Sequence, residues 1–474
     1  MKTEEMDKLA GDFDSDAARF SDMLHVGDSF DLVVRPVAGK ECRFMLFTLA
    51  GLTRSESLER LIAALEASEF ARDGKGAAAY AVRFVPAGTA RTETDFTRLA
   101  EGVLSGCTAV FSDGFGPEAL LADLRAYPAR DSEEPENDKV MRGSRDGFVE
   151  NLLTNVSLIR RRIRTPDLNV RAVRVGKSTR TDVAVLWIEG RADRNYAEDL
   201  AARIGGLGTD SLVLGHQSIA EALSPRGWLN PFPKTRATER PDAAAAILLE
   251  GGVIVLCDNS PEAMIFPVTL FHFLQETDDF YFGPLTGTYL RVLRHVIFWL
   301  TMIVTPLWLL VLRHSDFLPP ILHFLLPHDP GDLPILVQLI VTEFALDGLK
   351  LASLNTPNVL ASSLSVVGGL LLGDFAVTVG WVSPDVILYM AFVSIANFTQ
   401  SSYELGYAFK YLRVLSLLLT AAFDIWGFAA SLFIAVLLAA CNRTADGMRR
   451  FLWPLVPWNA RAMKRLVFRL KKED

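Results

Sequence analysis

The first 290 residues combine alternating apolar and polar positions, which predict strands, with apolar residues at helical spacing, which predict helices. SFDLVVRPV (29–37) alternates as a half-buried strand does, and ECRFMLFTLAG (41–51) is expected to form the next strand. Residues 29–128 therefore predict a small α/β domain, preceded by a weakly patterned acidic tail over residues 1–28. The other elements expected here are a helix from Ser55, a strand at 81–88, a helix near 93–104, a strand at 108–115 and a helix from Pro117.

A solvated linker is expected after this domain. Residues 129–138 hold five acids and one proline with almost nothing apolar, so we assign 129–141 to an acidic linker. Residues 142–290 then predict a second α/β domain, which opens with an amphipathic helix over 145–164.

The second domain repeats the order of elements of the first. TDVAVLWIEG (181–190), followed by a helix near 195–204, corresponds to residues 41–51 and their helix. AAILLEGGVIVLCDNSP (245–261) corresponds in the same way to residues 99–117. An internal duplication is the hypothesis that this order suggests, with two similar subdomains forming one head.

The hydrophobic pattern changes at residue 291. Residues 1–290 carry 33 basic and 44 acidic side chains, whereas residues 291–441 carry only 6 and 9. The charge-free runs in the second stretch approach the roughly 20 apolar residues that a membrane-crossing helix needs. A purely soluble protein is therefore excluded, and we expect a C-terminal α-helical transmembrane domain over 291–441. The charge-free runs are 296–312, 351–373, 386–403 and 425–442.

We expect four full spans, because the basic tail over 442–474, with 9 Lys and Arg against 3 acids, favours a cytoplasmic C-terminus. The N-terminus lacks the basic start and apolar stretch of a secretory signal, so both termini are expected in the cytoplasm. The expected spans are a helix kinked at Pro306 that ends at Leu312, and helices at about 359–380, 385–402 and 412–441.

Two segments of this domain are not counted as spans. Five prolines within residues 316–334 predict a loop or a shallow re-entrant segment. Residues 335–352 form an apolar helix with one polar stripe, which lies in the membrane interface or packs inside an assembly with the stripe facing water. The alternative, in which 335–352 crosses, would expel the basic tail from the cytoplasm.

Acidic residues within the apolar stretch are the candidate functional groups. Asp374 and Asp424 lie in predicted spans, where a charge is costly unless it faces water or a partner. Acids from several subunits would line a cation path, or each acid would bond to a neighbouring helix, and for Asp424 the two interpretations weigh equally. Glu343 and Asp347 belong to the polar stripe, for which we favour a solvated face.

Catalytic and metal-binding patterns are not found in the sequence. It contains no GxSxG, HExxH or GxxxxGK[ST] motif, so we expect no enzyme, no metal and no cofactor. An acidic head argues against nucleic acid as a partner. The four cysteines have no CxxC spacing and are expected to be reduced core residues. The basic run over 160–164 ends an amphipathic helix, and we favour helix capping with salt bridges to the acidic head over lipid or nucleic-acid binding.

Three long stretches resemble the GerA-type spore germination proteins: RGSRDGFVENLLTNVSLIRRRIRTPDL (142–168), residues 231–281 and SYELGYAFKYLR (402–413). Three others, residues 26–37, 373–398 and 451–462, resemble the SpoVAF branch of that family. The resemblance implies a place in the spore inner membrane and a role in breaking dormancy. It also implies ring-shaped homo-oligomers, pentamers among them, that conduct monovalent ions beside other germination membrane proteins.

The leading hypothesis is a cation-channel subunit whose cytoplasmic head gates a membrane base in contact with lipid. The alternative is a non-conducting scaffold or signalling subunit that couples nutrient receptors to another channel. Under the alternative, Asp374 and Asp424 only hold helices together.

Overall fold

The structure is a computed structural model of the 474-residue chain. It describes residues 7–69, 76–84, 90–127, 143–224, 230–276, 278–354, 369, 376–397, 399 and 402–468. The chain divides into two compact units. Unit 1 contains residues 1–225, 235–267 and 445–447, and unit 2 contains residues 226–234, 268–444 and 448–474.

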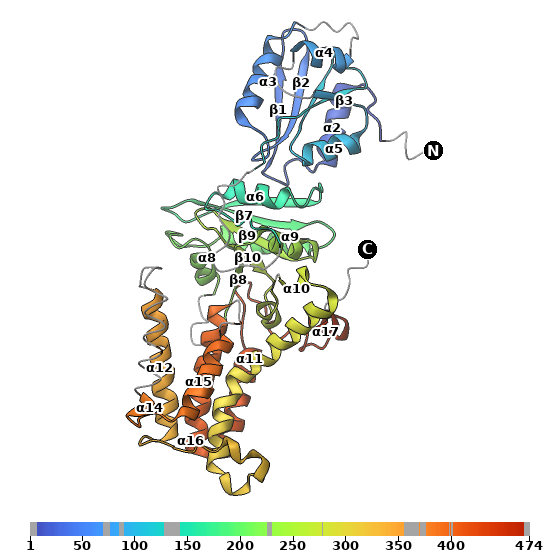
Figure 1. The fold of residues 1–474 in the computed structure, drawn as a ribbon. Helices are drawn as coiled ribbons and strands as arrows, with labels where there is room; N and C mark the ends of the chain where they lie inside the picture. Colours follow the sequence, from blue (N-terminus) through green and yellow to red (C-terminus); the bar gives the residue numbers. More distant parts are fainter. Residues whose placement is uncertain are drawn as a thin grey trace. The chain divides into compact units, whose positions relative to one another are not determined.

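Unit 1 holds two five-stranded antiparallel sheets, coloured blue to cyan and green in Figure 1. The first has the strand order β1-β2-β4-β5-β3, and the second has the order β6-β7-β9-β10-β8. The predicted repeat is therefore present, because both sheets place successive strands in the same positions. The strands are β1 Leu32–Ala38, β2 Arg43–Leu49, β3 Ala90–Glu93, β4 Thr108–Ser112, β5 Ala119–Ala122, β6 Leu168–Val175, β7 Thr181–Ile188, β8 Arg236–Thr238, β9 Val253–Cys257 and β10 Ala263–Phe266.

Helices cover both faces of each sheet. In β2, Phe44 and Leu46 pack on the α3 and α4 side, whereas Phe47 and Leu49 pack on the α2 and α5 side, as the two-residue period of a strand requires. The second sheet has the same three layers, with α6 and α9 on one face and α7 and α8 on the other. The helices of unit 1 are α2 Phe13–Met23, α3 Ser55–Ala67, α4 Gly76–Phe84, α5 Phe96–Leu104, α6 Leu152–Arg160, α7 Arg194–Gly205, α8 His216–Leu223 and α9 Pro241–Leu249.

Four predictions for unit 1 were wrong in part. The N-terminal tail contributes helix α2, whose Phe20 is fully buried against Phe47. Residues 81–84, expected in a strand, end helix α4. The segment after Pro117 forms strand β5, because a short run buried on both faces has no periodicity that separates a strand from a helix. The helix expected over 145–164 is the shorter α6. The predicted linker at 129–141 lies outside the described residues.

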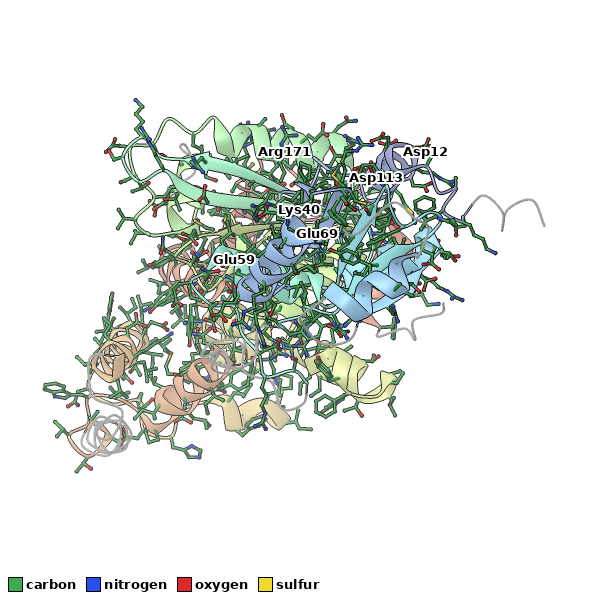
Figure 2. All side chains as sticks on the ribbon, turned by 90° about the horizontal axis from the view of Figure 1, so that it is seen from above. Asp12, Lys40, Glu59, Glu69, Asp113 and Arg171 are labelled. Atoms are coloured by element: carbon green, nitrogen blue, oxygen red, sulfur yellow. The ribbon has the colours of Figure 1, made fainter. Side chains whose placement is uncertain are left out.

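The basic run that begins at the last residue of α6 makes ion pairs within unit 1, as predicted. Arg160 donates from Nε and Nη2 to the two carboxylate oxygens of Asp31, both at 3.0 Å, and both side chains are buried. Arg162 pairs with Asp146 and donates to the carbonyl of Leu158, which caps the helix. Exposed pairs also occur, and Figure 2 labels Lys40 and Glu69, whose charged atoms are 2.6 Å apart.

Three of the four cysteines are buried and free, as expected. They are Cys42, Cys107 and Cys257, and burial raises the pKa of the Cys257 thiol to about 12. Cys441, at the end of a helix in unit 2, is exposed, so the prediction that it is a core residue was wrong.

Unit 2 is helical. Its helices are α10 Asp278–Tyr281, α11 Pro284–Arg313, α12 Ile335–Leu354, α14 Ala376–Thr378, α15 Pro384–Asn397, α16 Tyr403–Ala440 and α17 Ala460–Val467, with the 3₁₀ turns η1 Leu270–Leu274, η2 Ser315–Phe317 and η3 Pro320–Leu325. Helix α11 continues through Pro306. Among the described residues, α11 and α16 are long and apolar enough to cross a membrane, and α15 is a shorter apolar helix. The predicted four spans are thus not confirmed, and the span expected near 359–380 falls largely outside the described residues.

Helix α16, expected to be one span, is a pair of helices joined by a reversal. Asp424 has φ 59° and ψ −135°, which is not helical. The hydroxyl oxygens of Ser416 and Ser431 lie 2.7 Å apart, whereas fifteen residues of straight helix would separate them by about 22 Å. Residues 403–423 and 425–440 therefore form a tight antiparallel hairpin with Asp424 at its turn.

Candidate functional site: a charged cavity in unit 2

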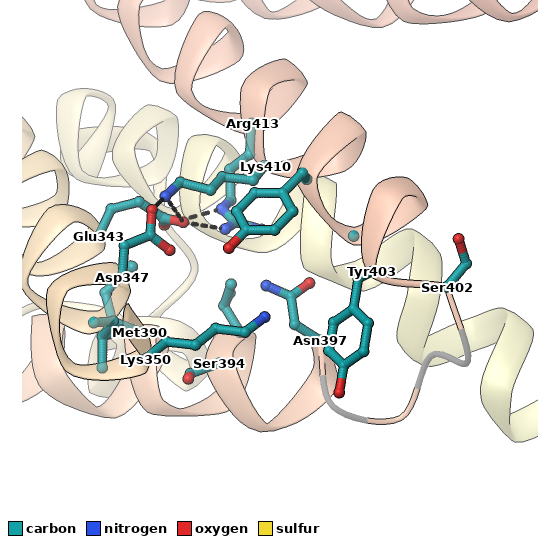
Figure 3. Close-up of a pocket in the computed structure, with 14 residues that line it drawn as sticks. Glu343, Asp347, Lys350, Met390, Ser394, Asn397, Ser402, Tyr403, Lys410 and Arg413 are labelled. Atoms are coloured by element: carbon teal, nitrogen blue, oxygen red, sulfur yellow. Dashed lines mark hydrogen bonds and ion pairs between the residues drawn. The ribbon is translucent and has the colours of Figure 1, made fainter. Parts of the chain in front are cut away.

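Two helices of unit 2 bring charges of opposite sign together. On α12, Glu343, Asp347 and Lys350 are spaced at i, i+4 and i+7, so they share one helical face. On α16, Lys410 and Arg413 are three residues apart and also share a face. These five side chains line the same cavity, which we name the charged cavity (Figure 3).

The Glu343–Arg413 pair is at the buried end of the cavity. Arg413 is fully buried and donates from Nη2 and Nε to the two carboxylate oxygens of Glu343, at 2.5 and 3.3 Å. Its Nη1 donates to the carbonyl of Thr301 on α11 at 3.0 Å. A forked guanidinium–carboxylate contact of this kind is geometrically specific, so the pair fixes three helices relative to one another.

The other two cations, Lys410 and Lys350, make different contacts in the cavity. Lys410 pairs with Asp347, and its Nζ is 3.9 Å from Oε1 of Glu343. The Nζ of Lys350 lies 4.8 and 5.2 Å from the ring centroids of Tyr403 and Tyr407, at distances typical of cation–π contacts.

Helix α15 supplies uncharged polar groups to the cavity. Ser394 and Asn397 line it, and the cavity volume is about 70 Å³, which is space for about two water molecules. Asn397 Oδ1 is buried without a hydrogen-bond partner among the described residues. A buried amide oxygen of this kind normally accepts a bond from water or a ligand, so the cavity suits a polar occupant.

The hairpin turn carries a second polar contact in unit 2. Nε2 of His314, at the end of α11, is 3.0 Å from both carboxylate oxygens of Asp424. The neighbouring Arg313 donates to the carbonyl of Thr420 at 3.1 Å and thereby satisfies a carbonyl at the end of the first helix of the hairpin. Both side chains of the His314–Asp424 pair are about two-fifths exposed.

The structure brings two of the four predicted site residues together. Glu343 and Asp347 share the charged cavity. The solvated face favoured for them was wrong for Glu343, which is 6% exposed, whereas the side chain of Asp347 is 31% exposed. Asp424 bonds to a neighbouring helix at the hairpin turn, in agreement with the second interpretation of that residue. Asp374 lies outside the described residues. A role of any of these acids in an ion path stays a prediction.

Sequence reasoning missed Lys410 and Arg413 as site residues. The available signal was two cations three residues apart at the start of an apolar run, facing no acid within their own helix. Their partner Glu343 is 70 positions from Arg413 in the sequence, so only the tertiary structure pairs them.

The chain combines an α/β unit of two repeated sheets with a helical unit, and two helices of the helical unit are long and apolar enough to cross a bilayer, as in a membrane protein. Residues 20–473 match the profile of the family described as Bacillus/Clostridium GerA spore germination protein. The chain belongs to this family.

Curated relatives match over most of their length. Stage V sporulation protein AF of Bacillus subtilis (strain 168) is 33% identical over 455 residues, which is 96% of this chain and 91% of the relative. Spore germination protein KA of the same strain is 27% identical, over 94% of this chain and 82% of its own. Spore germination protein GerLA of Bacillus cereus is 27% identical, over 91% of this chain and 88% of its own.

One solved structure is similar to part of the chain. It is the N-terminal domain of the A subunit of the Bacillus megaterium spore germinant receptor GerK3, with a TM-score of 0.41 and 22% identity. The match covers 54% of this chain and 95% of that domain.

Proposed function

We propose that the protein is a subunit of an oligomeric membrane channel that releases monovalent cations during spore germination. Family membership and relatives named for sporulation and germination support the process. The observation that supports conduction is the charged cavity, where five charged side chains meet polar groups of α15 inside a helical unit. Charges in membrane helices are costly and typically mark ion or substrate pathways.

The arrangement of charges corresponds to a closed state. Glu343 and Asp347 are each neutralised by a cation of the same subunit, Arg413 and Lys410. A carboxylate that is already paired gives a permeating cation little electrostatic stabilisation. Opening therefore requires α12 and α16 to separate these pairs, so that the acids from several subunits face the path.

The distribution of charges in the helical unit supports one orientation of this unit in the spore inner membrane. The end formed by residues 313–334, together with Asp385 and Asp424, holds five acids and one Arg. The sequence after residue 441, by contrast, is basic. The positive-inside tendency then places the tail in the cytoplasm.

Within this orientation the helix directions suggest more than four crossings. Gln338 at the start of α12 and Ser383 just before α15 are hydrogen-bonded, and His314 at the end of α11 contacts the α16 turn. We therefore propose that α11, α12, α15 and both helices of the α16 hairpin each cross the membrane. With the span expected from the sequence near 359–380 these make six crossings, an even number that keeps both termini in the cytoplasm.

A non-conducting scaffold is the second candidate. The observation that favours it is the complete pairing of Glu343 and Arg413, which would suffice to hold three helices together. A scaffold needs the charges only as contacts between helices, so breaking one pair would weaken assembly without creating a conductance.

Potassium flux from proteoliposomes separates the two candidates. Lys410→Met leaves Asp347 without its cation and should raise flux above that of the parent, whereas Lys410→Met/Asp347→Asn should return flux to the parent level. Asp182→Asn, an exposed acid in the head, is the matched control and should leave flux unchanged. Flux equal to empty vesicles in every variant, with the protein folded and oligomeric, would contradict the channel and favour the scaffold.

A further inference from the structure

The chain after the α16 hairpin combines positive charge with exposed apolar side chains. Residues 448–468 contain five basic residues and no acid. Arg449, Arg450 and Lys464 are exposed. Leu455, Val456, Trp458 and Phe468 are also exposed, by 46, 59, 66 and 48% respectively.

The segment is ordered against the helical unit. Nη1 of the buried Arg291 on α11 donates to the carbonyl of Leu466 on α17 at 3.1 Å, and the backbone NH of Leu270 donates to the carbonyl of Phe451 at 2.7 Å. Asn459 caps α17 by accepting from the backbone NH of Ala462. A folded surface therefore presents the exposed apolar groups.

Helix α11 also exposes apolar side chains at its start. Its first two turns expose Leu285 and Tyr289, by 86 and 62%, and α11 packs on α17. Exposed aromatic rings beside the start of a membrane helix are typical of the interface between headgroups and acyl chains. In α17 itself Leu466 is buried, so the exposed apolar groups are those that precede and follow the helix.

We propose that residues 448–468 form an anionic-lipid anchor, in which Trp458 and its apolar neighbours enter the headgroup region while Arg449, Arg450 and Lys464 bind lipid phosphates. Charge complementarity favours anionic lipid as the binding partner, because five cations without an acid bind a negatively charged leaflet better than a neutral one. This inference goes beyond conduction and applies equally to a scaffold. It rests only on the membrane location of unit 2.

A probe in the segment of the full chain tests the anchor. Val456→Cys in a Cys441→Ser background places one reactive thiol on the surface, because the other three cysteines are buried. The thiol is labelled with an environment-sensitive fluorophore, and the protein is reconstituted into vesicles of phosphatidylcholine alone or with phosphatidylglycerol added as the anionic lipid. Brominated acyl chains then report contact with lipid, and aqueous iodide reports contact with water.

The anchor predicts lipid quenching at least about twofold stronger in the anionic vesicles, with loss of the difference at high salt. Arg449→Gln/Arg450→Gln/Lys464→Gln should abolish the difference, whereas the head control Arg35→Gln/Arg171→Gln/Lys177→Gln, which removes the same charge from exposed positions, should retain it. Equal quenching in both vesicles would overturn the proposal. So would a probe shielded from both quenchers, which would mean that a second protein surface covers the segment.

Discussion

At the scale of single residues, buried ion pairs stabilise both units. Asp31 with Arg160 in unit 1 and Glu343 with Arg413 in unit 2 are each paired through both carboxylate oxygens. Removing one partner of such a pair leaves a buried charge without compensation, which costs far more than the pair itself contributes. These residues are therefore sensitive to truncation, although their replacement by a matched apolar pair could be tolerated.

Asp31→Ala should lower the free energy of unfolding of unit 1 by about 3–5 kcal/mol, because Arg160 would remain buried and charged. The matched control is Asp14→Ala, which breaks the exposed pair with Arg43 and should cost about 1 kcal/mol or less. Urea unfolding followed by circular dichroism of the full chain measures both. Equal costs for the two variants would contradict the buried character of the Asp31–Arg160 pair.

Lys234 gives stability a defined pH dependence. Burial lowers the pKa of its ammonium group from 10.5 to about 8, and its Nζ donates to Oδ1 of Asn442 within unit 2. The unfolded chain binds this proton more tightly than the folded chain does. Burial of the charged lysine therefore lowers the free energy of unfolding by its full amount below about pH 8. This stability is regained as the pH rises from 8 towards 10.5.

Lys234→Met should accordingly raise the melting temperature more at about pH 7 than at about pH 10. The reason is that the lysine of the folded parent is charged at pH 7 and largely neutral at pH 10. Comparison of variant with parent at each pH removes the titration of all other groups. Lys177→Met, at an exposed position in the head, is the control and should show no such pH-dependent difference. An equal effect of Lys234→Met at both pH values would show that the lysine is not desolvated.

At the scale of elements, the reversal in α16 decides the architecture of unit 2. A β-carbon at Gly427 would lie 1.9 Å from the carbonyl oxygen of Leu419, so the glycine lies directly against the backbone of the facing helix. At Gly348 on α12, by contrast, a β-carbon would meet nothing within 4 Å. The two glycines occupy helices of the same unit with opposite steric demands.

Gly427→Ala should therefore destabilise unit 2 by about 3 kcal/mol or more, because backbone must move to admit the methyl group. Gly348→Ala should be neutral or stabilising by up to about 1 kcal/mol, as expected for a helix interior. Thermal unfolding in detergent compares them. A Gly427→Ala protein as stable as the parent would mean that residues 403–440 do not form the hairpin.

The elements that the sequence predicted well are those with local periodicity. Strands β2 and β7 and helices α3, α5 and α7 follow from alternation or helical spacing, and the repeat of their order follows from comparing the two halves. Strand β5 and the α16 turn could not be predicted, because ALLA is buried on both faces and the reversal depends on contact between Gly427 and Leu419.

The candidate site was half predictable for the same reason. The i, i+4 spacing of Glu343 and Asp347 identified a polar face on an apolar helix. Whether that face meets water or cations depends on Lys410 and Arg413, which are distant in sequence. The local sequence pattern therefore located the acids, and tertiary packing determined that they pair with cations.

At the scale of the whole molecule, the chain passes repeatedly between the units. Residues 445–447 belong to unit 1, although the residues on both sides of them belong to unit 2. Within unit 1, the hydroxyl of Tyr196 donates to Oδ2 of Asp446 at 2.8 Å, and Arg203 donates to the carbonyl of Ala445 at 3.1 Å. These hydrogen bonds hold residues 445–447 to the rest of unit 1.

Tyr196→Phe/Arg203→Met should release this segment and speed tryptic cleavage after Arg443 or Arg449 by roughly tenfold or more, because two of its side-chain hydrogen-bond donors are lost. The control is Tyr289→Phe, which changes an exposed hydroxyl on α11. Mass spectrometry of limited digests identifies the cleaved bonds. An unchanged cleavage rate would show that contacts other than those of Tyr196 and Arg203 hold the segment.

We propose that the helical unit conducts cations once its ion pairs separate. Current across a planar bilayer with a potassium chloride gradient tests it most directly, for the parent and for Lys410→Met. Lys410→Met should show a larger conductance than the parent, with a reversal potential close to that of a potassium-selective membrane. The absence of current from both folded, oligomeric proteins, or a reversal potential on the chloride side, would contradict it.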